Sequence, residues 1–358
     1  MTIPAKPWIK RIARALNHRI GLMPETDYAK RVEQELKNYS EDIDVHQLPE
    51  IFHYWSNRYI RPWFEQAGTT HPEDLFARYM VKAAKTAESE CAWFLSIGAG
   101  NCDAEAAIAS DLISRGLENF RLVCLDINPD MLRRGREHAR NAGVLDHLEF
   151  HQADFNFYEP DRTFDAVIAN QCLHHVTELE NLFDAIESCL SPRGLFITSD
   201  MIGRNGHQRW PEALSIVEDL WRELPDRYKF NHQMQRLEQP FVNHDCSAES
   251  FEGIRAQDIL PLLIERFSFH VFIAFGNVVD IFIDRGFGHN FDANSEDDRK
   301  FIDRVHAIDE QGFREGTLTP THMVAVMSHR DNPADSPIMA RGLDPAACIR
   351  PSDASENT

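Results

Sequence analysis

The sequence lacks several features that define whole classes of protein. No apolar run approaches the roughly 18 residues of a transmembrane helix, and the basic N-terminus has no apolar stretch of the signal-peptide type. Its 7 cysteines are scattered, with no CxxC pair and none beside a histidine at the spacing of zinc ligands. From these absences we expect no stable membrane insertion, no metal site, and a reducing, cytoplasmic location.

Basic residues are also scarce. The chain of 358 residues has 37 lysines and arginines against 57 acidic residues, which gives a net charge of −20. A surface of this charge repels the phosphate backbone, so we expect no nucleic-acid partner. The length is sufficient for one large domain or for two.

The most informative segment runs from residue 93 to residue 117. An apolar stretch predicts a buried strand, which ends at Gly98-Ala99-Gly100 and is followed by a helix-compatible run. Gly98 permits a tight turn, and Gly100 lets a ligand approach the backbone because it has no Cβ. The N-terminus of the following helix offers free N–H groups to an anionic group. The order strand, glycine turn, helix is typical of a nucleotide-binding α/β unit.

The same alternation continues along the chain. Further strands are expected at 120–126, 147–154, 164–170, 195–200, 267–275 and 321–327. Strands that alternate with helices predict an α/β, Rossmann-like fold, with a mostly parallel sheet of seven strands. Ligands of such sheets bind beyond the carboxyl ends of the strands, where Gly98, Asp126, Asp154 and Asn170 fall.

This arrangement, over about residues 75–200 and the two later strands, resembles the class I S-adenosylmethionine-dependent methyltransferases. The resemblance implies S-adenosylmethionine as the cofactor and methyl transfer as the activity. An ionised carboxylate can accept charge-assisted hydrogen bonds from both ribose hydroxyls, which accounts for an acid at the end of the second strand. The implied cofactor contacts are Gly98, Ala99 and Gly100 at the methionine part, Asp126 and the adjacent Ile127 at the ribose, Asp154 and Phe155 at the adenine, and Asn170 beside the sulfonium.

The glycine turn departs from the family pattern at two positions. The family's acid two residues before the first glycine is Ser96 here, and the third glycine is replaced by Cys102. The resemblance therefore assigns the cofactor's amino group to Asp103 or Glu105. NAD is the rival cofactor, but its fingerprint requires a third glycine where Asp103 stands, so it fails at that position.

The sequence constrains the acceptor site less than the cofactor site. His174 and His175 follow the fourth strand, and the resemblance to plant-type small-molecule O-methyltransferases implies a general base at His174, with His175 as the second candidate. An imidazole suits removal of a hydroxyl proton because it titrates near neutrality, while packing at a helix start is the alternative interpretation. His232, His244 and Arg255 are candidates to face a substrate, and a surface ion pair is the alternative for each.

Three segments flank or interrupt this pattern. Residues 1–75 predict a helical N-terminal extension, whose basic amphipathic stretch Trp8–Ile20 suits a membrane surface, its own domain, or the second subunit of a homodimer. The methyltransferase domain is expected over 76–330, with an insertion at 204–266 that forms either a lid over the acceptor or a plain subdomain or dimer arm. Residues 331–358 predict a disordered tail.

The sequence thus predicts an enzyme that methylates a small molecule, with oxygen favoured over nitrogen or carbon as the acceptor atom. The Asn-Pro-Pro-Tyr/Phe motif of N6-adenine methylation is absent after the fourth strand, where Asn170 is followed by Gln171. Two alternatives stay open. One is transfer of the aminocarboxypropyl group from the same cofactor, and the other is a protein that keeps the fold for binding without turnover.

Overall fold

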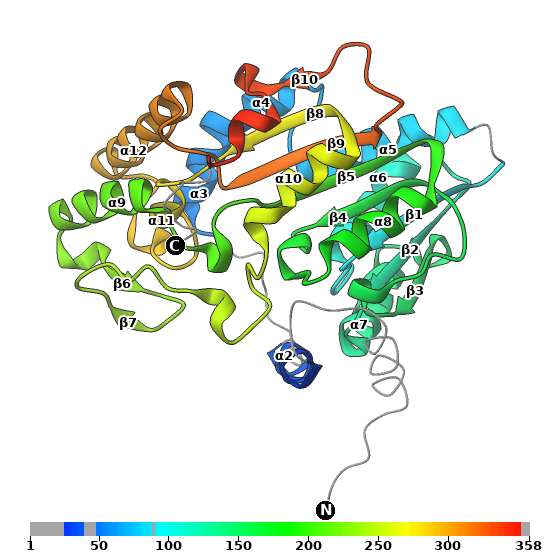
Figure 1. Cartoon of the computed structure of the whole chain (residues 1–358), viewed down its shortest axis with the longest axis horizontal. Coiled ribbons are helices and arrows are strands. Elements are labelled where there is room, and N and C mark those ends of the chain that lie inside the picture. Colours follow the sequence, from blue (N-terminus) through cyan, green and yellow to red (C-terminus); the bar gives the residue numbers. More distant parts are fainter. Residues whose placement is uncertain (1–24, 39–47, 88–89, 352–358) are drawn as a thin grey trace, which may run out of the picture.

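The central feature is a sheet of eight strands in the order β10-β8-β9-β5-β4-β1-β2-β3 (Figure 1). The computed structural model describes residues 25–38, 48–87 and 90–351. Only β9 runs antiparallel to its neighbours, β5 and β8, and every other adjacent pair in the sheet is parallel. The predicted Rossmann-like, mostly parallel sheet is therefore confirmed.

The seven predicted strands form close to their predicted places. The middle strands β1 and β4 are buried along nearly their whole length, which agrees with their continuous apolar sequences. The seven strands are β1 (Ala92–Ile97), β2 (Phe120–Asp126), β3 (Leu148–Gln152), β4 (Phe164–Asn170), β5 (Leu190–Met201), β8 (Phe267–Phe275) and β9 (His322–His329).

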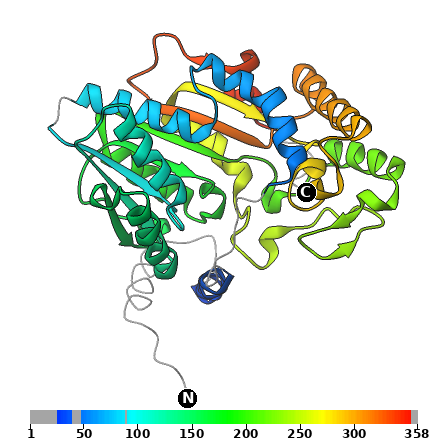
Figure 2. The same ribbon diagram turned by 180° about the vertical axis from the view of Figure 1, so that it is seen from behind.

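Helices cover both faces of this sheet. On one face, seen in Figure 2, lie α5 (Pro72–Ala87), α6 (Asp103–Ser114) and α7 (Pro129–Asn141). On the other lie α8 (Leu179–Cys189) and α10 (Ala256–Arg266). Consecutive strand residues divide between the two cores, as period-2 alternation requires: Phe94 packs on the α5 side and Leu95 on the α8 side.

A second group of elements, which we call the side lobe, packs beside the sheet on the left of Figure 1. It is held by an aromatic cluster in which Trp221 contacts Phe282 and Phe287, and Tyr228 stacks on Phe291. The lobe comprises α3 (Glu50–Trp55), α9 (Pro211–Glu223), β6 (Phe230–Asn231), β7 (Arg236–Leu237), α11 (Asp280–Ile283) and α12 (Glu296–Glu315).

The predicted insertion therefore needs two corrections. Helix α10, which we placed in the insertion, covers the sheet and packs against α8. The segment between β8 and β9, which we did not include, supplies α11 and α12 to the same lobe. Apolar periodicity predicts that such helices form, but it does not say which of two neighbouring cores receives them.

The two ends of the chain also differ from a simple extension and tail. The N-terminal part is helical where it is described, with α2 (Glu25–Asn38), α3, a π-helical turn η1 (Ser56–Ile60) and α4 (Arg61–Gln66), whereas Trp8–Ile20 lies outside the described residues. The expectation of disorder is wrong for residues 331–351. This stretch adds β10 (Ile338–Met339) to the sheet edge beside β8 and buries Cys348. Residues 352–358 lie outside the described part.

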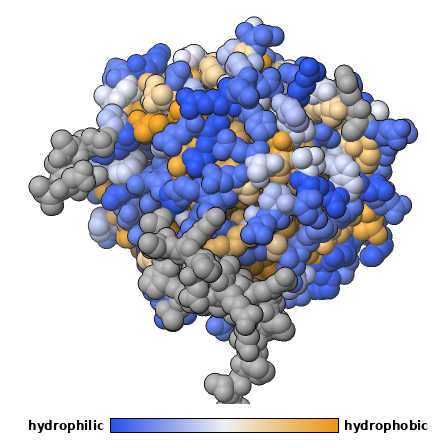
Figure 3. Space-filling view, turned by 45° about the vertical axis from the view of Figure 1, so that its right-hand side comes forward, coloured by the Kyte–Doolittle hydropathy of each residue, from blue (hydrophilic) through white to orange (hydrophobic). Residues whose placement is uncertain are grey.

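Within the described residues, no helix combines the length and the apolar character needed to cross a membrane. The face shown in Figure 3 is mostly hydrophilic, and its hydrophobic side chains form separate patches. This surface agrees with the strongly acidic composition.

Candidate functional site

The glycine turn after β1 takes the predicted conformation. Gly98 and Gly100 both have left-handed backbone angles, with φ of +66° and +53°. A Cβ added to Gly98 would lie 2.5 Å from the Cβ of Cys172, so glycine is also needed for the approach of the loop after β4. Cys102 has a left-handed backbone as well, with φ 54°. Its side chain packs closely against Gly135 of α7, where an added Cβ would lie 2.8 Å from the Cys102 sulfur.

Glu105 lies next to Ser96, the residue that stands at the position of the family's strand acid. The Ser96 hydroxyl donates to Glu105 Oε1 over 2.7 Å, and both side chains are buried. Burial raises the pKa of Glu105 to about 7, and the hydrogen bond from Ser96 opposes this only partly. Asp103, the other candidate for the cofactor's amino group, instead forms an ion pair of 2.5 Å with His138 of α7. The structure thus brings only Glu105 next to the end of β1.

Asp126 ends β2 with its carboxylate half occupied. Its Oδ2 accepts from the Gly100 backbone N–H over 2.9 Å, and its Oδ1 accepts from the Asn128 N–H over 2.7 Å. Burial raises the pKa of Asp126, while these two backbone hydrogen bonds act in the opposite direction. A carboxylate has about four acceptor positions, so one stays open on each oxygen. Two open positions are the number that a ribose diol requires.

Asp154 is bound by a helix that the sequence did not connect with it. Tyr28 of α2 donates its hydroxyl to Asp154 Oδ2 over 2.5 Å. The backbone and side-chain amides of Asn156 donate to Oδ1 over 3.0 and 3.1 Å. Burial raises the pKa of the Asp154 carboxyl, while these hydrogen bonds act to lower it.

Helix α2 covers the cofactor-side edge of the sheet. Tyr28 and Val32 are buried with Phe251, and Ile127 and Phe157 pack against them. Figure 1 shows α2 at the bottom, separate from the other N-terminal helices. Phe155 is half-buried and packs against the core on the α8 side of the sheet. Ile127, a predicted cofactor contact, is therefore also a contact of α2.

His174 is held from one side by Asp200, at the end of β5. Asp200 accepts from the backbone N–H groups of residues 172, 173 and 174 over 3.0, 2.7 and 3.3 Å. It also contacts His174 Nδ1 at 2.6 Å. Asn170, the last residue of β4, is half-buried and pairs with Ser199 of β5. Asp200 thereby fixes both the turn after β4 and the orientation of the His174 ring.

Three further titratable side chains, Glu252, His207 and Glu35, surround His174 and the adjacent His175. Glu252 Oε1 lies 3.4 Å from His174 Nε2 and 2.8 Å from His207 Nε2. His175 Nε2 lies 3.3 Å from the other Glu252 oxygen, and its Nδ1 lies 3.4 Å from Glu35 of α2. Burial alone would lower the pKa of His174, but Asp200 and Glu252 outweigh it and raise the pKa to about 10.

This environment bears on the predicted general base. An imidazole with a pKa near 10 carries both protons at neutral pH, so it has no lone pair with which to take a proton from an acceptor. His174 is positioned as predicted after β4, but it is a hydrogen-bond donor in the described state. The role of either histidine as a base therefore remains a prediction, and for His174 the electrostatics oppose it.

The sequence predicts no metal site, but the described residues include one group of side chains that could hold a metal ion. His174, His207 and Glu252 each offer one ligand atom, and these atoms lie within 4.8 Å of one another. The residues come from three loops, and His207 and Glu252 are 45 positions apart. No short sequence motif joins them, which is why the sequence did not reveal the cluster.

The three predicted substrate contacts are not brought together. His232 is bound to Asn290 at 2.9 Å in the side lobe. His244 is exposed in the loop after β7, where its backbone N–H donates to the Val242 carbonyl over 2.9 Å. Arg255 donates to both carboxylate oxygens of Glu180 over 2.6 and 2.8 Å, and it also pairs with Asp258 over 2.7 Å. The assignment of Arg255 to a substrate carboxylate is therefore corrected to an ion-pair role at the start of α10.

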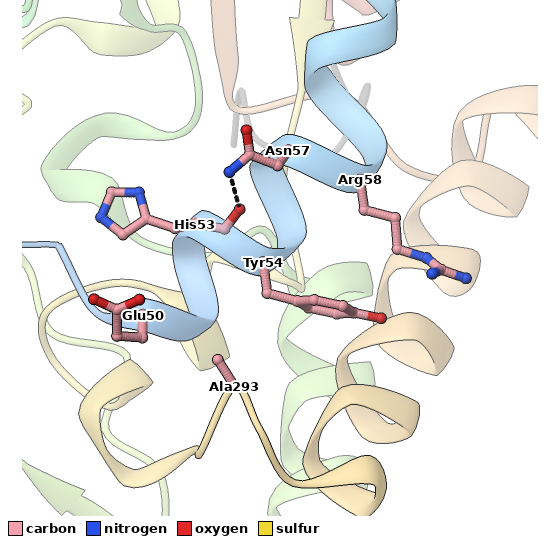
Figure 4. Close-up of a pocket in the computed structure, with 6 residues that line it drawn as sticks. All are labelled: Glu50, His53, Tyr54, Asn57, Arg58 and Ala293. Carbon is pink, nitrogen blue, oxygen red and sulfur yellow. Dashed lines mark hydrogen bonds between the residues drawn. The ribbon is translucent and has the colours of Figure 1, made fainter.

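A hollow of about 460 Å³ on the side lobe is shown in Figure 4. None of the predicted site residues lines it, and Tyr54 and Arg58 point from their own helix toward α12, where the Tyr54 hydroxyl donates to Asp303 over 2.8 Å. The hollow shares no residue with the site at the sheet edge, and we assign it no role. Its lining residues are Glu50, His53, Tyr54, Asn57, Arg58 and Ala293.

Comparison with known proteins identifies methyltransferases among the relatives of this chain. A family profile described as a methyltransferase domain matches residues 95–196. The ubiquinone/menaquinone biosynthesis C-methyltransferase UbiE of Escherichia fergusonii is 31% identical over 157 residues, which are 42% of this chain and 57% of that protein. The corresponding protein of an Enterobacter species is 30% identical over 150 residues, 40% of this chain and 55% of its own length. The chain thus spans little more than half the length of the curated relatives it matches.

Solved structures give broader but weaker similarities. A methyltransferase from Geobacter sulfurreducens in complex with S-adenosyl-L-homocysteine overlaps 79% of this chain and 99% of its own, with 14% identity and a TM-score of 0.38. A geranyl diphosphate C-methyltransferase from Streptomyces coelicolor overlaps 92% of this chain and 100% of its own, with 11% identity and a TM-score of 0.39. At these TM-scores the overlaps carry no argument. The sheet order, the glycine turn with its acids, and the matched profile together show that the chain carries a class I S-adenosylmethionine-dependent methyltransferase domain.

Proposed function

We propose that the chain transfers the methyl group of S-adenosylmethionine to a small-molecule acceptor. The observation that carries this proposal is the half-occupied carboxylate of Asp126 beside the left-handed glycine turn, inside the matched segment. Its two open acceptor positions suit the ribose diol of a nucleoside cofactor. The cofactor supplies an activated sulfonium, so that positioning of the acceptor provides much of the rate.

The chain's own residues divide the work of holding the cofactor. Asp126 would bind the ribose, and Glu105, buried beside Ser96, would face the amino group. Asp154 has one acceptor position left on Oδ2 after Tyr28 and Asn156 are counted, which suffices for one adenine N–H. Asn170 at the end of β4 would border the sulfonium.

We further propose an acceptor with an ionisable hydroxyl, such as a phenol or an enol. The support is the pair of imidazoles beside His174, His175 and His207, which contact the Glu252 carboxylate and can take up and move a proton. Deprotonation of such a group activates both the oxygen and the adjacent ring carbon. The relatives are named C-methyltransferases, so the predicted preference for oxygen has no support from them, and we favour carbon.

The experiment is a turnover assay on the purified chain. We would incubate it with S-adenosylmethionine and a panel of phenols, quinols and amines, and analyse both products by mass spectrometry. Release of S-adenosylhomocysteine with a C-methylated phenol is the expected result, and O- or N-methylated products would revise only the acceptor atom. Release of 5′-methylthioadenosine would indicate aminocarboxypropyl transfer instead, and absence of cofactor binding in calorimetry would contradict the proposal as a whole.

We also propose a location, a substrate class and an assembly for the chain. All 7 cysteines are unpaired, which favours a reducing compartment such as the cytoplasm. The net charge of −20 favours a small molecule over nucleic acid as the substrate. A homodimer is tested directly by sedimentation at several protein concentrations. We also propose that α2 and the loop 246–252, which contact each other through Arg31, cover the acceptor in the bound state.

A further inference from the structure

Three loops meet around His174 in an arrangement that the proposed reaction does not by itself explain. The Gly206 N–H donates to the Gly253 carbonyl over 2.9 Å, and the Ile254 N–H donates to the His174 carbonyl over 3.0 Å. These backbone hydrogen bonds tie together the residues next to His207, Glu252 and His174. The three side chains are therefore held by a common scaffold.

The two glycines in this scaffold are required by close contact. A Cβ added to Gly206 would lie 1.9 Å from Asp245 Oδ1, and one added to Gly253 would lie 3.0 Å from the Gly206 nitrogen. Both have positive φ, at +65° and +69°. Gly206 precedes His207 and Gly253 follows Glu252, so the loops can approach only if these positions lack side chains. The approach is what sets His207 Nε2 at 2.8 Å from Glu252 Oε1.

From this geometry we propose that His174, His207 and Glu252 form a binding site for a divalent transition-metal ion such as Zn²⁺. Two imidazoles and one carboxylate are a common ligand set for such ions, and the remaining coordination positions stay open for water or an acceptor oxygen. The proposal goes beyond the proposed function, because metal binding is measured without cofactor or turnover.

The distances between the ligand atoms suit a shared ion. With metal–ligand bonds of about 2.0–2.1 Å, ligand atoms lie about 3.4 Å apart in a tetrahedral shell and about 2.9 Å apart in an octahedral one. The observed separations are 3.4 Å between His174 Nε2 and Glu252 Oε1, and 2.8 Å between His207 Nε2 and the same oxygen. All three atoms lie within 4.8 Å of one another, so small side-chain rotations complete the set.

Asp200 supplies the outer contact that metal-bound histidines usually have. It accepts from His174 Nδ1 at 2.6 Å, which leaves Nε2 as the ligand atom and fixes the plane of the ring. His174 is only 3% exposed, and Asp200 is fully buried. An ion at this place would occupy the position of the proton that His174 Nε2 otherwise shares with Glu252.

The test is zinc binding by the untagged full chain, because a histidine tag would bind zinc by itself. Protein dialysed against a chelator is titrated with Zn²⁺ by calorimetry in the presence of a competing chelator. We expect one zinc ion per chain with a Kd below about 1 μM. Glu252→Gln and His207→Gln are each expected to weaken binding at least about 100-fold, more than the loss of an outer contact typically causes.

The matched control is His151→Gln, which removes an exposed histidine that lies 3.6 Å from Glu149. It should bind zinc as the unchanged chain does. Thermal unfolding of the metal-free variants checks that they fold, and Glu252→Asp, which keeps a carboxylate, should recover part of the affinity lost in Glu252→Gln. The proposal is overturned if the unchanged chain binds no stoichiometric zinc, or if folded Glu252→Gln binds it equally well.

Discussion

Asp126→Ala is the sharpest test of the cofactor site, because the structure shows which acceptor positions of this carboxylate are already filled. One acceptor position on each oxygen is filled by a backbone N–H, from Gly100 and from Asn128. The variant leaves the glycine turn and β2 in place but removes both acceptors for the ribose. Hydrogen bonds to a charged group contribute about 1.5–3 kcal/mol each.

The expected loss of affinity is about 1.5–3 kcal/mol in total rather than twice that, since water enters the space left by the carboxylate and satisfies one hydroxyl. At about 1.4 kcal/mol for each factor of ten, the Kd for S-adenosylmethionine rises about 10- to 150-fold. Asp126→Asn should bind the cofactor at least as weakly, because the NH2 group of the asparagine would face a backbone N–H, which is also a donor. Calorimetric titration with S-adenosylhomocysteine, which is not turned over, measures each Kd.

The control for these variants is Asp130→Ala, which removes an exposed acid in the first turn of α7. It should change the Kd by less than about twofold, since an exposed charge outside the proposed cofactor site contributes little to binding. Thermal unfolding of the cofactor-free proteins separates a loss of binding from a loss of folding. If Asp126→Ala folds and binds the cofactor as tightly as the unchanged chain, the ribose assignment and the counting of acceptor positions are both refuted.

Three further predictions concern folding around the site. Because burial raises the pKa of Glu105 from 4.5 to about 7, the folded state binds its proton more tightly than the unfolded chain, and the free energy of unfolding falls by up to about 3 kcal/mol as the pH rises from about 4.5 to 7. Urea unfolding across this range should show the slope, and Glu105→Gln should lack it; equal slopes would contradict the assignment. Tyr28→Phe removes the hydroxyl that donates to Asp154 and should weaken the docking of α2 by about 1–3 kcal/mol. Amide exchange should become faster in residues 25–38 and stay unchanged in β1 and β4. Unchanged exchange in α2 would contradict this prediction. Gly98→Ala should lower the melting temperature well below that of Gly116→Ala, since both positions have positive φ but only the first adds a clash; similar values would count against the close contact with Cys172.

Much of the fold was predictable because it depends on local patterns. Continuous apolar runs separated by helical ones indicate a parallel sheet, and each of the seven predicted strands formed within a few residues of its place. Gly98, Gly100 and Asp126 were predictable for the same reason, since a turn at the end of a buried strand places them at the sheet edge whatever the rest of the chain does.

The side lobe and the end of the chain were not predictable in this way. Helices α10 and α12 are both amphipathic, yet one covers the sheet and the other builds the lobe. The two residues of β10 are too few to carry a periodicity, and they are ordered because the edge of β8 offers unpaired backbone groups. In both cases the partner surface, rather than the segment itself, decides the outcome.

The sequence by itself determined the sheet, the glycine turn, and the acids that would hold a nucleoside, because these depend on residues close together in the chain. Only the tertiary structure decided that Tyr28 binds Asp154, that Asp200 orients His174, and that His207 and Glu252 converge on it. Those contacts join loops far apart in sequence, and their positions depend on how the sheet, α2 and the side lobe pack around one another. Side-chain chemistry names the possible partners, but packing selects which of them meet.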